Sequence, residues 1–485
     1  MTRLLSLLRI FGLMLTVFSS TYLLPILTAL IYSDGTEMLF VMDMALTLGA
    51  GLLLWRMTHR FQVELKARDG FILVVLAWLG MAAFATFPLM SHLIDLSFTD
   101  AYFETMSGLS TTGSTILSNL DYLPPAINLW RHELNWLGGM GIIVLAVAIL
   151  PILGVGGRQL YVAETPGPMK DSKLTPRITE TAKNLWVTYA VITLACILAL
   201  KWAGMDWLDA VCHAFATMGL GGFSTHDASV GYFNSPEIEA VLIVFMLLAG
   251  MNFATHFMAW QNRNFSPYGH DIEVMPYLVL ILGSCVGIGF YLWQMDVYPT
   301  FLTALRHASF NLVSIGTDCG FASADFNEWP IFAPLWMLFV SCLAACTGST
   351  GGGIKMMRTL ILLKQSQMQM FLLTHPASIN PVKLGGTVIS SRILLSVLGF
   401  IFAYFMTTVI LTLLLVISGL DFVSSFSAII ASLNNAGPGL GEVGPASNYA
   451  SLSDVQTWIC TLAMFLGRIE IFTALILFTP AFWRK

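Results

Sequence analysis

The run SerThrThrGly at residues 110–113 follows a hydrophobic segment, and the chain repeats this arrangement three times: GlyLeuGlyGly at 219–222, ThrAspCysGly at 317–320 and AsnAsnAlaGly at 434–437. The final glycines of these runs are 109, 98 and 117 residues apart. A feature repeated at similar spacing predicts four copies of one structural unit around an axis, each contributing one loop. In a membrane-like sequence, an axis lined by four backbone loops indicates an ion pore.

The composition indicates a membrane protein. Of the 485 residues, 56% are hydrophobic and only 11% are charged, which is too apolar for one soluble globule. The first apolar stretch, residues 10–31, is longer than the core of a signal peptide, so we interpret it as a transmembrane helix. The seven cysteines are scattered without a CxxC pair, which favours neither a zinc site nor a disulfide framework.

About 20 apolar residues are needed to cross a bilayer, and ten segments approach this length. They are residues 10–31, 38–55, 71–92, 134–155, 185–203, 238–260, 274–294, 331–363 with an interruption, 391–418 and 455–480. Lysine and arginine gather after the second, fourth, sixth and eighth spans, which predicts that these segments and both termini are cytoplasmic. The opposite segments are rich in Asp and Glu, including Glu104 and Glu239, so we expect an outer face that attracts cations.

Each glycine run follows a moderately apolar segment that is too short to span the membrane. These segments start near Asp100, Asp209, Leu302 and Asp421. A half-length helix that enters from outside directs the negative end of its dipole at the membrane centre, which favours a cation there. The loop that follows offers backbone oxygens, as in a cation filter. Four ordinary extracellular turns are the alternative, but the equivalent positions of the four runs favour the filter.

Four longer motifs carry a resemblance to a known family. They are LeuGlyGlyPheSerThrHisAsp from Leu220, GlySerThrGlyGlyGlyIleLys from Gly348, LeuAsnAsnAlaGlyProGlyLeuGlyGlu from Leu433 and GlyArgIleGluIlePhe from Gly467. With them the chain resembles, over nearly its whole length, the TrkH/TrkG/KtrB family of bacterial potassium-translocating subunits, related to fungal Trk and plant HKT transporters. Two spans ahead of the first repeat favour the TrkH branch.

The resemblance implies an all-α polytopic membrane protein. About ten transmembrane helices would form four membrane-helix, pore-helix, membrane-helix repeats around one central pore, preceded by two N-terminal helices. The expected parts are an extension at 1–69, repeat 1 with a cytoplasmic loop at 70–184, repeat 2 at 185–272, repeat 3 with a gating loop at 273–390, and repeat 4 at 391–485.

The resemblance also implies a potassium filter with one stretch from each repeat. Its residues would be Thr111, Thr112, Gly113, Leu220, Gly221, Gly222, Thr317, Asp318, Cys319, Gly320, Asn434, Asn435, Ala436 and Gly437. Glycine suits these loops because it adopts positive φ and lets the backbone approach the ion. In that family a glycine in the first loop goes with potassium and a serine with sodium, so Gly113 points to potassium.

The eighth span is interrupted by consecutive glycines, which break helical hydrogen bonding unless protein or water satisfies the freed groups. The resemblance implies that this segment is an intramembrane gating loop below the filter, and that Arg468 works with it to obstruct the pore. The expected gate residues are Gly348, Ser349, Thr350, Gly351, Gly352, Gly353, Lys355 and Arg468.

Arg468 lies near the middle of the last predicted span. A charge facing lipid there costs roughly 2.5–3.5 kcal/mol, so we expect Arg468 to face protein or water. Pairing with Glu470 is the alternative to a position facing the pore. Residues two apart on a helix do not face each other, so we expect the partners of both groups on neighbouring elements.

The third filter run departs from the family pattern, which commonly has hydroxyl or small residues where this chain has Asp318 and Cys319. An Asp318 that points into the pore would strengthen cation binding, whereas one that points away would brace the loop, and we favour bracing. We interpret Cys319 as a packing residue. His226 and Asp227 follow the second run, and we expect a hydrogen-bonding pair at the outer mouth rather than a proton relay.

We expect potassium uptake, either down the gradient or coupled to protons as a symport, and no enzymatic activity. The alternative is a secondary transporter that couples another solute to protons or sodium. A membrane-embedded hydrolase has no support, since we find no nucleophile with a neighbouring base.

The resemblance implies a multi-pass protein of the bacterial inner membrane that forms a homodimer. It also implies cytoplasmic TrkA-type nucleotide-binding regulatory subunits, which the basic loops 156–184 and 364–390 would dock. Nucleotide would act only through that partner, potassium would be the bound ion, and no nucleic acid would be involved.

Overall fold

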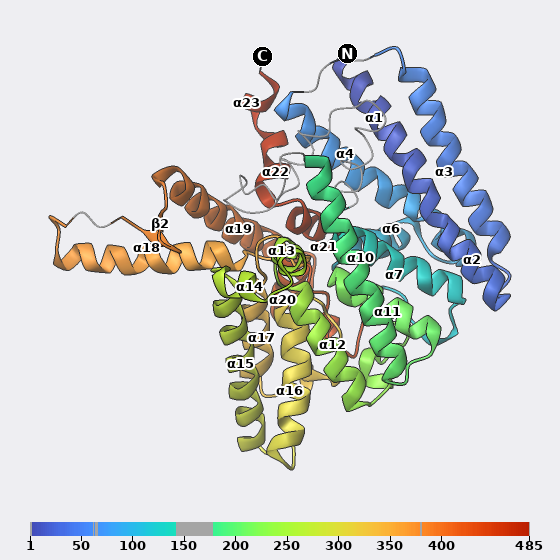
Figure 1. Cartoon of the computed structure of the whole chain (residues 1–485). Helices are drawn as coiled ribbons and strands as arrows, with labels where there is room; N and C mark the ends of the chain where they lie inside the picture. Colours follow the sequence, from blue (N-terminus) through green and yellow to red (C-terminus); the bar gives the residue numbers. More distant parts are fainter. Residues whose placement is uncertain (1, 62, 64–65, 142–177, 379–380, 485) are drawn as a thin grey trace.

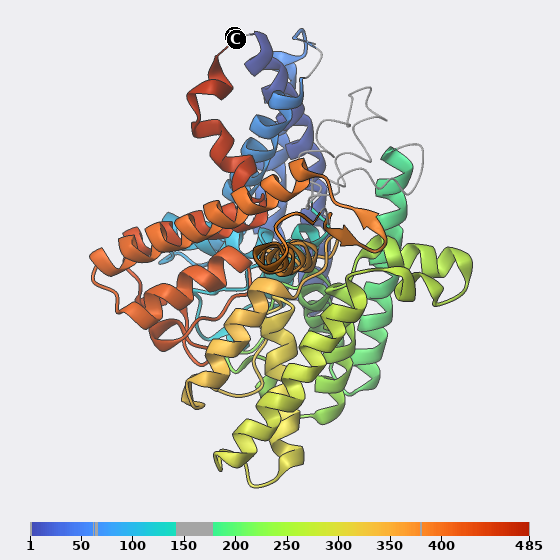
Figure 2. The ribbon, with the colours of Figure 1, turned by 90° about the vertical axis from the view of Figure 1, so that its left-hand side faces the viewer.

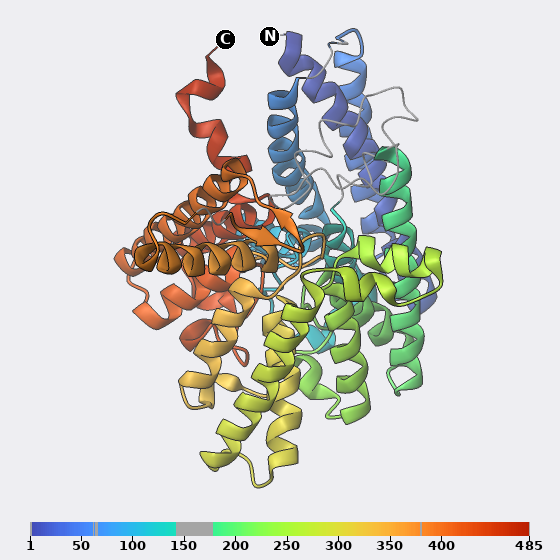
Figure 3. The same cartoon turned by 60° about the vertical axis from the view of Figure 1, so that its left-hand side comes forward.

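The computed structural model describes residues 2–61, 63, 66–141, 178–378 and 381–484. Its secondary structure is mostly helical, with a short antiparallel hairpin of β1 (Lys383–Leu384) and β2 (Thr387–Val388). The two ends of the chain lie near one another at one end of the molecule (Figures 1 and 3). The fold consists of an N-terminal group of helices and four similar units.

The N-terminal group contains α1 (Thr2–Phe18), α2 (Leu23–Tyr32) and α3 (Glu37–Thr58), with a 3-10 turn at Ser19–Tyr22. Helices α1 and α3 approach closely because glycines face each other where they cross. A Cβ atom on Gly12 would lie only 2.8 Å from the carbonyl oxygen of Gly51. These backbones are therefore packed as closely as small residues in membrane helices allow.

Each of the four units contains a long helix, a short pore helix and a returning helix, which confirms the predicted fold class. The units are α4 (Ala67–Ala85) with α5 (Phe87–His92), α6 (Phe98–Leu109) and α7 (Pro125–Gly139); α10 (Ile178–Trp202), α11 (Trp207–Gly219) and α12 (Pro236–Ala249); α15 (Val274–Gln294), α16 (Phe301–Gly316) and α17 (Phe332–Leu343); and α19 (Ser391–Ile417), α20 (Phe422–Asn434) and α21 (Asp454–Arg468).

Further elements connect or extend these units. They are α13 (Phe253–Asn262), α14 (Ser266–His270), α18 (Met356–Thr374), α22 (Ile471–Leu475) and α23 (Pro480–Trp483), with 3-10 turns at Leu120–Tyr122, Ser229–Tyr232, Phe326–Glu328, Gly441–Val443, Tyr449–Ser451 and Ile476–Phe478. Helix α18 projects from the helical body in Figure 1 and is seen nearly end-on in Figure 2.

The spans differ from the prediction in two places. In the described residues six helices are long and apolar enough to cross a membrane, and two bent pairs raise this number to eight. The predicted spans 238–260 and 455–480 are not single straight helices, because the chain bends by 95° after α12 and by 109° after α21. At the first bend Asn252 accepts the backbone N–H of Ala254 and starts a new helix.

Two other predicted spans are also modified. The interrupted span 331–363 consists of α17 and the start of α18, which are joined by the glycine-rich loop. The span 134–155 begins inside α7 and continues into 142–177, which lies outside the described residues, as does most of the basic loop 156–184. The second basic segment, 364–390, contains the end of α18 and the β1–β2 hairpin.

Candidate functional site

The four pore helices all begin with a side-chain cap. In each, an oxygen just before the helix accepts the backbone N–H three residues on, which satisfies one of the free donors of the first turn. The capping residues are Ser97 for α6, Asp206 for α11, Thr300 for α16 and Asp421 for α20. The helices are 12 to 16 residues long, which is shorter than the roughly 20 residues of a membrane-spanning helix.

The pore helices also end in the same turn. The residue two positions before each filter glycine has left-handed backbone geometry, which is uncommon for residues other than glycine. These residues are Thr111, Leu220, Asp318 and Asn435, with φ between 52° and 67°. The next backbone N–H bonds to a carbonyl five residues back at 2.8 Å in all four loops: Thr112 to Ser107, Gly221 to Ala216, Cys319 to Ser314 and Ala436 to Ala431.

The four filter glycines pack in a closed ring, which we call the filter ring. A Cβ atom on each would collide with the carbonyl oxygen of the residue before the next glycine in chain order. The pairs are Gly113 with Gly221, Gly222 with Cys319, Gly320 with Ala436 at 2.6 Å, and Gly437 with Thr112 at 2.7 Å. All four glycines have positive φ, from 60° to 94°. The structure thus brings the four predicted loops together around one axis.

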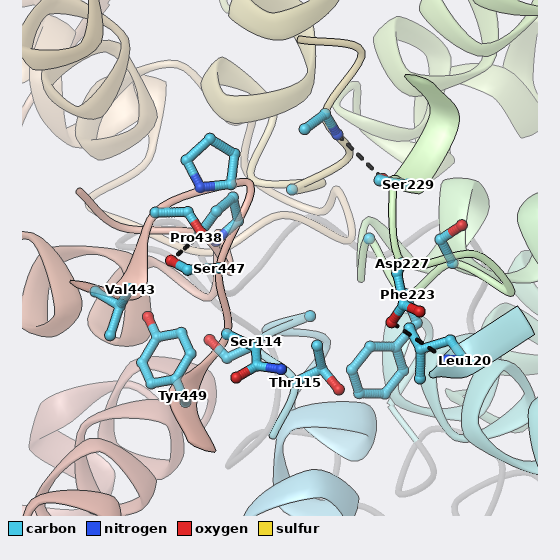
Figure 4. A pocket seen from close by; sticks show the side chains of 18 of the residues that line it. Ser114, Thr115, Leu120, Phe223, Asp227, Ser229, Pro438, Val443, Ser447 and Tyr449 are labelled. Carbon is cyan, nitrogen blue, oxygen red and sulfur yellow. Dashed lines mark hydrogen bonds between the residues drawn. The ribbon is translucent and has the colours of Figure 1, made fainter. Parts of the chain in front are cut away.

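A polar cavity lies next to the filter ring. Figure 4 shows that segments of all four units contribute to its wall, including Ser114, Thr115, Asp227 and Tyr449. Three of the ring glycines line it, together with Pro438, which follows the fourth glycine. The ring therefore opens into a space lined by hydroxyl groups and backbone together with charged and apolar side chains.

The polar side chains of the filter loops are bonded to the helices that surround the ring. Asn434 accepts a hydrogen bond from the Tyr404 hydroxyl at 2.6 Å and donates one to Ser341 at 2.8 Å. Asn435 donates to the Thr112 hydroxyl at 2.9 Å and to the Met464 carbonyl at 3.0 Å. The fourth loop is thus held by its side chains, and the backbone oxygens of the loops are candidate ion ligands.

Asp318 is fully buried beside the glycine-rich loop. A Cβ atom on Gly351 would lie 3.3 Å from its Oδ2, and the opposite charge nearby is that of Lys355. The Lys355 ammonium in turn donates a hydrogen bond to the Gly351 carbonyl. This arrangement favours a bracing role for Asp318 between filter loop and gating loop. Cys319 is a buried free thiol, as expected for a packing residue.

The predicted gating loop, Gly348–Gly353, is held by contacts from the second unit. The Gly348 carbonyl accepts the N–H of Phe253 at 3.1 Å, and the N–H of Thr350 bonds to the Ala249 carbonyl at 3.4 Å. The Thr350 hydroxyl donates to the Met218 carbonyl at 3.0 Å. The bend between α12 and α13 thus supplies partners for the broken backbone.

Two glycines of the gating loop lie against filter loops three and four. A Cβ atom on Gly351 would lie 2.9 Å from the Thr317 carbonyl oxygen, and one on Gly352 would collide with the Asn434 carbonyl oxygen. Side chains are excluded at both positions by backbone. The gating loop therefore packs directly against the ends of two pore helices, α16 and α20.

Arg468 connects three elements of the candidate pathway. Its guanidinium donates to the Thr350 carbonyl at 2.9 Å, to the Thr111 hydroxyl at 3.2 Å, and to the carbonyls of Gly138 and Gly139 at the end of α7. The free carbonyls and the negative dipole end of a helix stabilise such a cation. As predicted, its partners lie on neighbouring elements, and Glu470 instead pairs with Arg358 at 2.8 Å.

A buried ion pair behind the first pore helix was missed. Glu104 on α6 binds Arg131 on α7 at 2.8 Å, and each side chain is 1% exposed. Arg131 also donates to the Thr115 hydroxyl at 3.2 Å and to the Ser224 carbonyl at 3.3 Å, so it joins the segments after filter loops one and two. The predicted outer segments contain few basic residues, so the presence of Arg131 among acidic residues was the available sequence signal for an ion pair.

The prediction that Glu104 and Glu239 contribute charge to an acidic outer face is wrong. Glu104 is buried against Arg131, and Glu239 is buried against Arg306 at 2.6 Å. Opposite charges at these distances neutralise the field that either carboxylate would project into solvent. The attraction of cations to this face must come from the remaining acidic residues.

His226 pairs with acids distant in sequence rather than with its neighbour Asp227. Its ring nitrogens contact Asp121 and, at 3.3 Å, Asp209. Partial burial lowers the pKa of His226, but hydrogen bonds and the charges of Asp209 and Asp121 outweigh it and raise the pKa above its usual value. The ring stacks on Tyr232 with centroids 3.5 Å apart, so this cluster connects the segment after the second filter loop with Asp121 and Asp209.

The fold and the filter ring define a polytopic membrane protein of the cation-transport class rather than an enzyme. The family profile described as "TrkH: Cation transport protein" matches residues 36–485. The chain belongs to this TrkH family.

Individual relatives agree over the whole chain. The Trk system potassium uptake protein TrkH of Salmonella typhimurium is 46% identical over 478 residues, or 98% of this chain and 99% of that protein. The Trk system potassium uptake protein TrkG of Escherichia coli K12 is 39% identical over 98% of this chain and 97% of its own length. The crystal structure of the potassium transporter TrkH from Vibrio parahaemolyticus matches with a TM-score of 0.89 and 42% identity, covering 99% of this chain and 100% of that chain.

Proposed function

We propose that this protein takes up potassium through the filter ring. The supporting observation is the ring itself, in which four glycines with positive φ bring four backbone loops into mutual contact. Rings of backbone carbonyls replace the hydration shell of a cation and still release it, because each interaction is weak. The four pore helices end at the ring, so their negative dipole ends favour a cation there.

Selectivity for potassium rests on the first loop. In members of the family, a glycine at this position is associated with potassium selectivity, and this chain has Gly113 there. The fit is tight, since any Cβ atom at position 113 would collide with the Gly221 carbonyl oxygen. A serine at 113 would therefore displace a neighbouring filter carbonyl and change the size of the ring.

The gating loop and Arg468 form the proposed barrier on the other side of the filter. The loop packs on Thr317 and Asn434, and Arg468 bonds to Thr350 in the loop and Thr111 in the filter. A fixed positive charge at this place raises the electrostatic energy of a passing cation. Opening of the pore requires Arg468 to exchange its hydrogen bonds to Thr350 and Thr111 for other contacts.

The proposed assembly is a homodimer in the bacterial inner membrane with both termini in the cytoplasm. A cytoplasmic ring of TrkA-type nucleotide-binding subunits would regulate it, and transport would be either passive or coupled to protons. The projecting helix α18 and the β1–β2 hairpin offer a surface outside the helical body for such contacts (Figure 1). Copurification with a regulatory ring that changes flux would support this arrangement, and a ring without effect would contradict it.

Rubidium uptake into vesicles that carry the purified chain tests the proposal. Potassium, sodium and caesium are added as competitors, and Gly113→Ser is measured beside wild type. Gly35→Ser is the matched control, because Gly35 also has positive φ, at 79°, but a Cβ atom added there would have no neighbour within 4 Å. We expect potassium-competed uptake in wild type and the control, and loss of discrimination in Gly113→Ser.

Two outcomes contradict the proposal. Equal competition by all cations in wild type would show that the uptake is not selective for potassium. The absence of flux even with a regulatory ring would favour the secondary transporter. That alternative needs helix N-termini directed at the substrate, whereas here the C-termini of the four pore helices meet at the ring.

A further inference from the structure

Glu273 contacts the chain on both sides of the gating loop. It lies in the connection between α14 and α15, and it is only 3% exposed. A single carboxylate oxygen, Oε2, accepts the backbone N–H of Thr347 at 2.8 Å and that of Met357 at 3.1 Å. Thr347 precedes the loop and Met357 follows it, so one side chain holds both ends.

The two N–H groups need such a partner. Met357 is the second residue of α18, where backbone donors have no acceptor within the helix, and the residue before that helix provides no side-chain cap. Thr347 lies where α17 has already ended. A carboxylate at a helix N-terminus also benefits from the positive end of the dipole. Glu273 therefore caps α18 from a distant part of the sequence.

Glu273 is itself anchored without help from the gating loop. Its backbone N–H bonds to Asp271 Oδ1 at 3.0 Å, and the other oxygen of Asp271 accepts the Thr255 hydroxyl at 2.6 Å. The neighbouring Ile272 packs into the apolar cluster of α18 and the β1–β2 hairpin, where a Cβ atom on Gly385 would collide with its side chain. The acceptor is thus held by contacts that lie outside Gly348–Gly353.

We propose that Glu273 is a positioning residue that holds the gating loop against the filter by binding both of its ends. This inference rests on the proposed gating function of Gly348–Gly353. Loss of the carboxylate frees Thr347 and Met357 together, so the loop can leave the ends of the pore helices. Conduction should then increase while selectivity, which is set by the filter ring, stays unchanged.

The charge of Glu273 gives the closed position a pH dependence. Burial raises the pKa of Glu273 to about 7, and Asp271 adds to the increase, whereas the N–H of Thr347 and the charge of Lys355 oppose it. The Cys346 thiol is the other titratable group that interacts with it. Because the pKa of Glu273 is raised when the gating loop is closed, its carboxyl binds a proton more readily in the closed position than when it is open to water. Lower cytoplasmic pH, through about 7, should therefore favour closure.

Three variants test the inference in vesicles loaded with the full chain. Glu273→Ala removes the acceptor, Glu273→Gln keeps one carbonyl oxygen that can accept both N–H groups, and Glu237→Gln makes the same change at a fully exposed side chain. We expect rubidium flux to rise roughly tenfold in Glu273→Ala, because two hydrogen bonds to a charged group are lost. Glu273→Gln should keep low flux but lose the dependence on internal pH, and Glu237→Gln should match wild type.

Hydrogen exchange supplies a readout that does not depend on transport. The amides of Thr347 and Met357 should exchange faster in Glu273→Ala and at nearly the wild-type rate in Glu273→Gln. Wild-type flux together with wild-type exchange in Glu273→Ala would overturn the inference. Faster exchange without any cation flux in wild type would instead contradict the proposed transport function and leave the contact of Glu273 with the loop established.

Discussion

The filter ring and the gating loop are both built from glycines, but they are held in different ways. Each filter loop is fixed by hydrogen bonds to its own pore helix, and all four loops share one backbone conformation. The gating loop occurs once and is held by groups from elsewhere, including Met218, Glu273 and Arg468.

This difference separates two physical requirements. A filter must keep its oxygens in place as ions pass. Hydrogen bonds to its own pore helix hold each of the four loops, and the ring glycine of each loop packs on the next loop. A gate must exchange one set of contacts for another, which is possible when a few long-range bonds hold it. Asp318 and Lys355 lie where the two regions meet, so they are among the groups, with Arg468, through which one region can affect the other.

The largest effect is expected from an added methyl group in the ring. In Gly222→Ala the Cβ atom would collide with the Cys319 carbonyl, so rubidium flux should fall at least roughly a hundredfold or lose selectivity. Gly35→Ala is the control, because it has similar φ strain, which costs roughly 1 kcal/mol, but no neighbour within 4 Å. Equal flux in the two variants would mean that the close packing of the ring is unimportant.

Removal of the charge at the gate should have the next largest effect. Arg468→Gln loses a cation that bonds to Thr350 and Gly139, so flux should rise about tenfold with unchanged competition between potassium and sodium. Arg306→Gln, which removes a partly exposed guanidinium that pairs with Glu239, should leave flux near wild type. Reduced flux in Arg468→Gln would show that this arginine supports the conducting state rather than the barrier.

A double-mutant cycle tests the connection between the two regions. Asp318→Asn and Lys355→Met should each lower the thermal stability of the purified protein, and the double variant should recover roughly 1 kcal/mol relative to additivity. Because Asp318 lies beside Gly351, potassium selectivity should be unchanged in Asp318→Asn. A change in selectivity would place this carboxylate in the ion path.

The smallest effect is expected at the outer mouth. Since Asp209 and Asp121 raise the pKa of His226, protonation stabilises the folded protein, and this contribution is complete below the usual histidine pKa. It is lost as the pH rises through the raised pKa. The Tm difference between wild type and His226→Gln should therefore be on the order of 1 °C at low pH and shrink toward pH 8. A difference that grows with pH would contradict this assignment.

Much of the fold could be predicted from sequence. Apolar segments of about 20 residues gave most spans, and the predicted start at Asp421 is the capping residue of α20, whereas the predicted start near Asp209 lies three residues after the cap of α11, Asp206. The bends after α12 and α21 could not be found in this way. Hydropathy is averaged over a window of residues, so it does not detect a bend of the chain within four residues.

The sequence predicted the backbone loops of the candidate site, but it did not predict the side-chain contacts that hold these loops. The glycine runs identify the ring because positive φ and close approach are local demands on residue type. The pairing of Glu104 with Arg131, of His226 with Asp121, and of Glu273 with Thr347 joins residues that are 27, 105 and 74 positions apart. Charge counts alone gave the wrong expectation that Glu104 and Glu239 contribute to an exposed acidic face.

The sequence by itself determined that this is a membrane protein with four glycine loops after short helices, because hydrophobic length and glycine position act through local physics. Four short motifs also indicated the family, whose profile matches residues 36–485. Only the tertiary structure decided that Arg468 binds the end of α7 and that Glu273 clamps both ends of the gating loop. Long-range hydrogen bonds depend on how separate helices meet, and residue order along the chain does not specify those meetings.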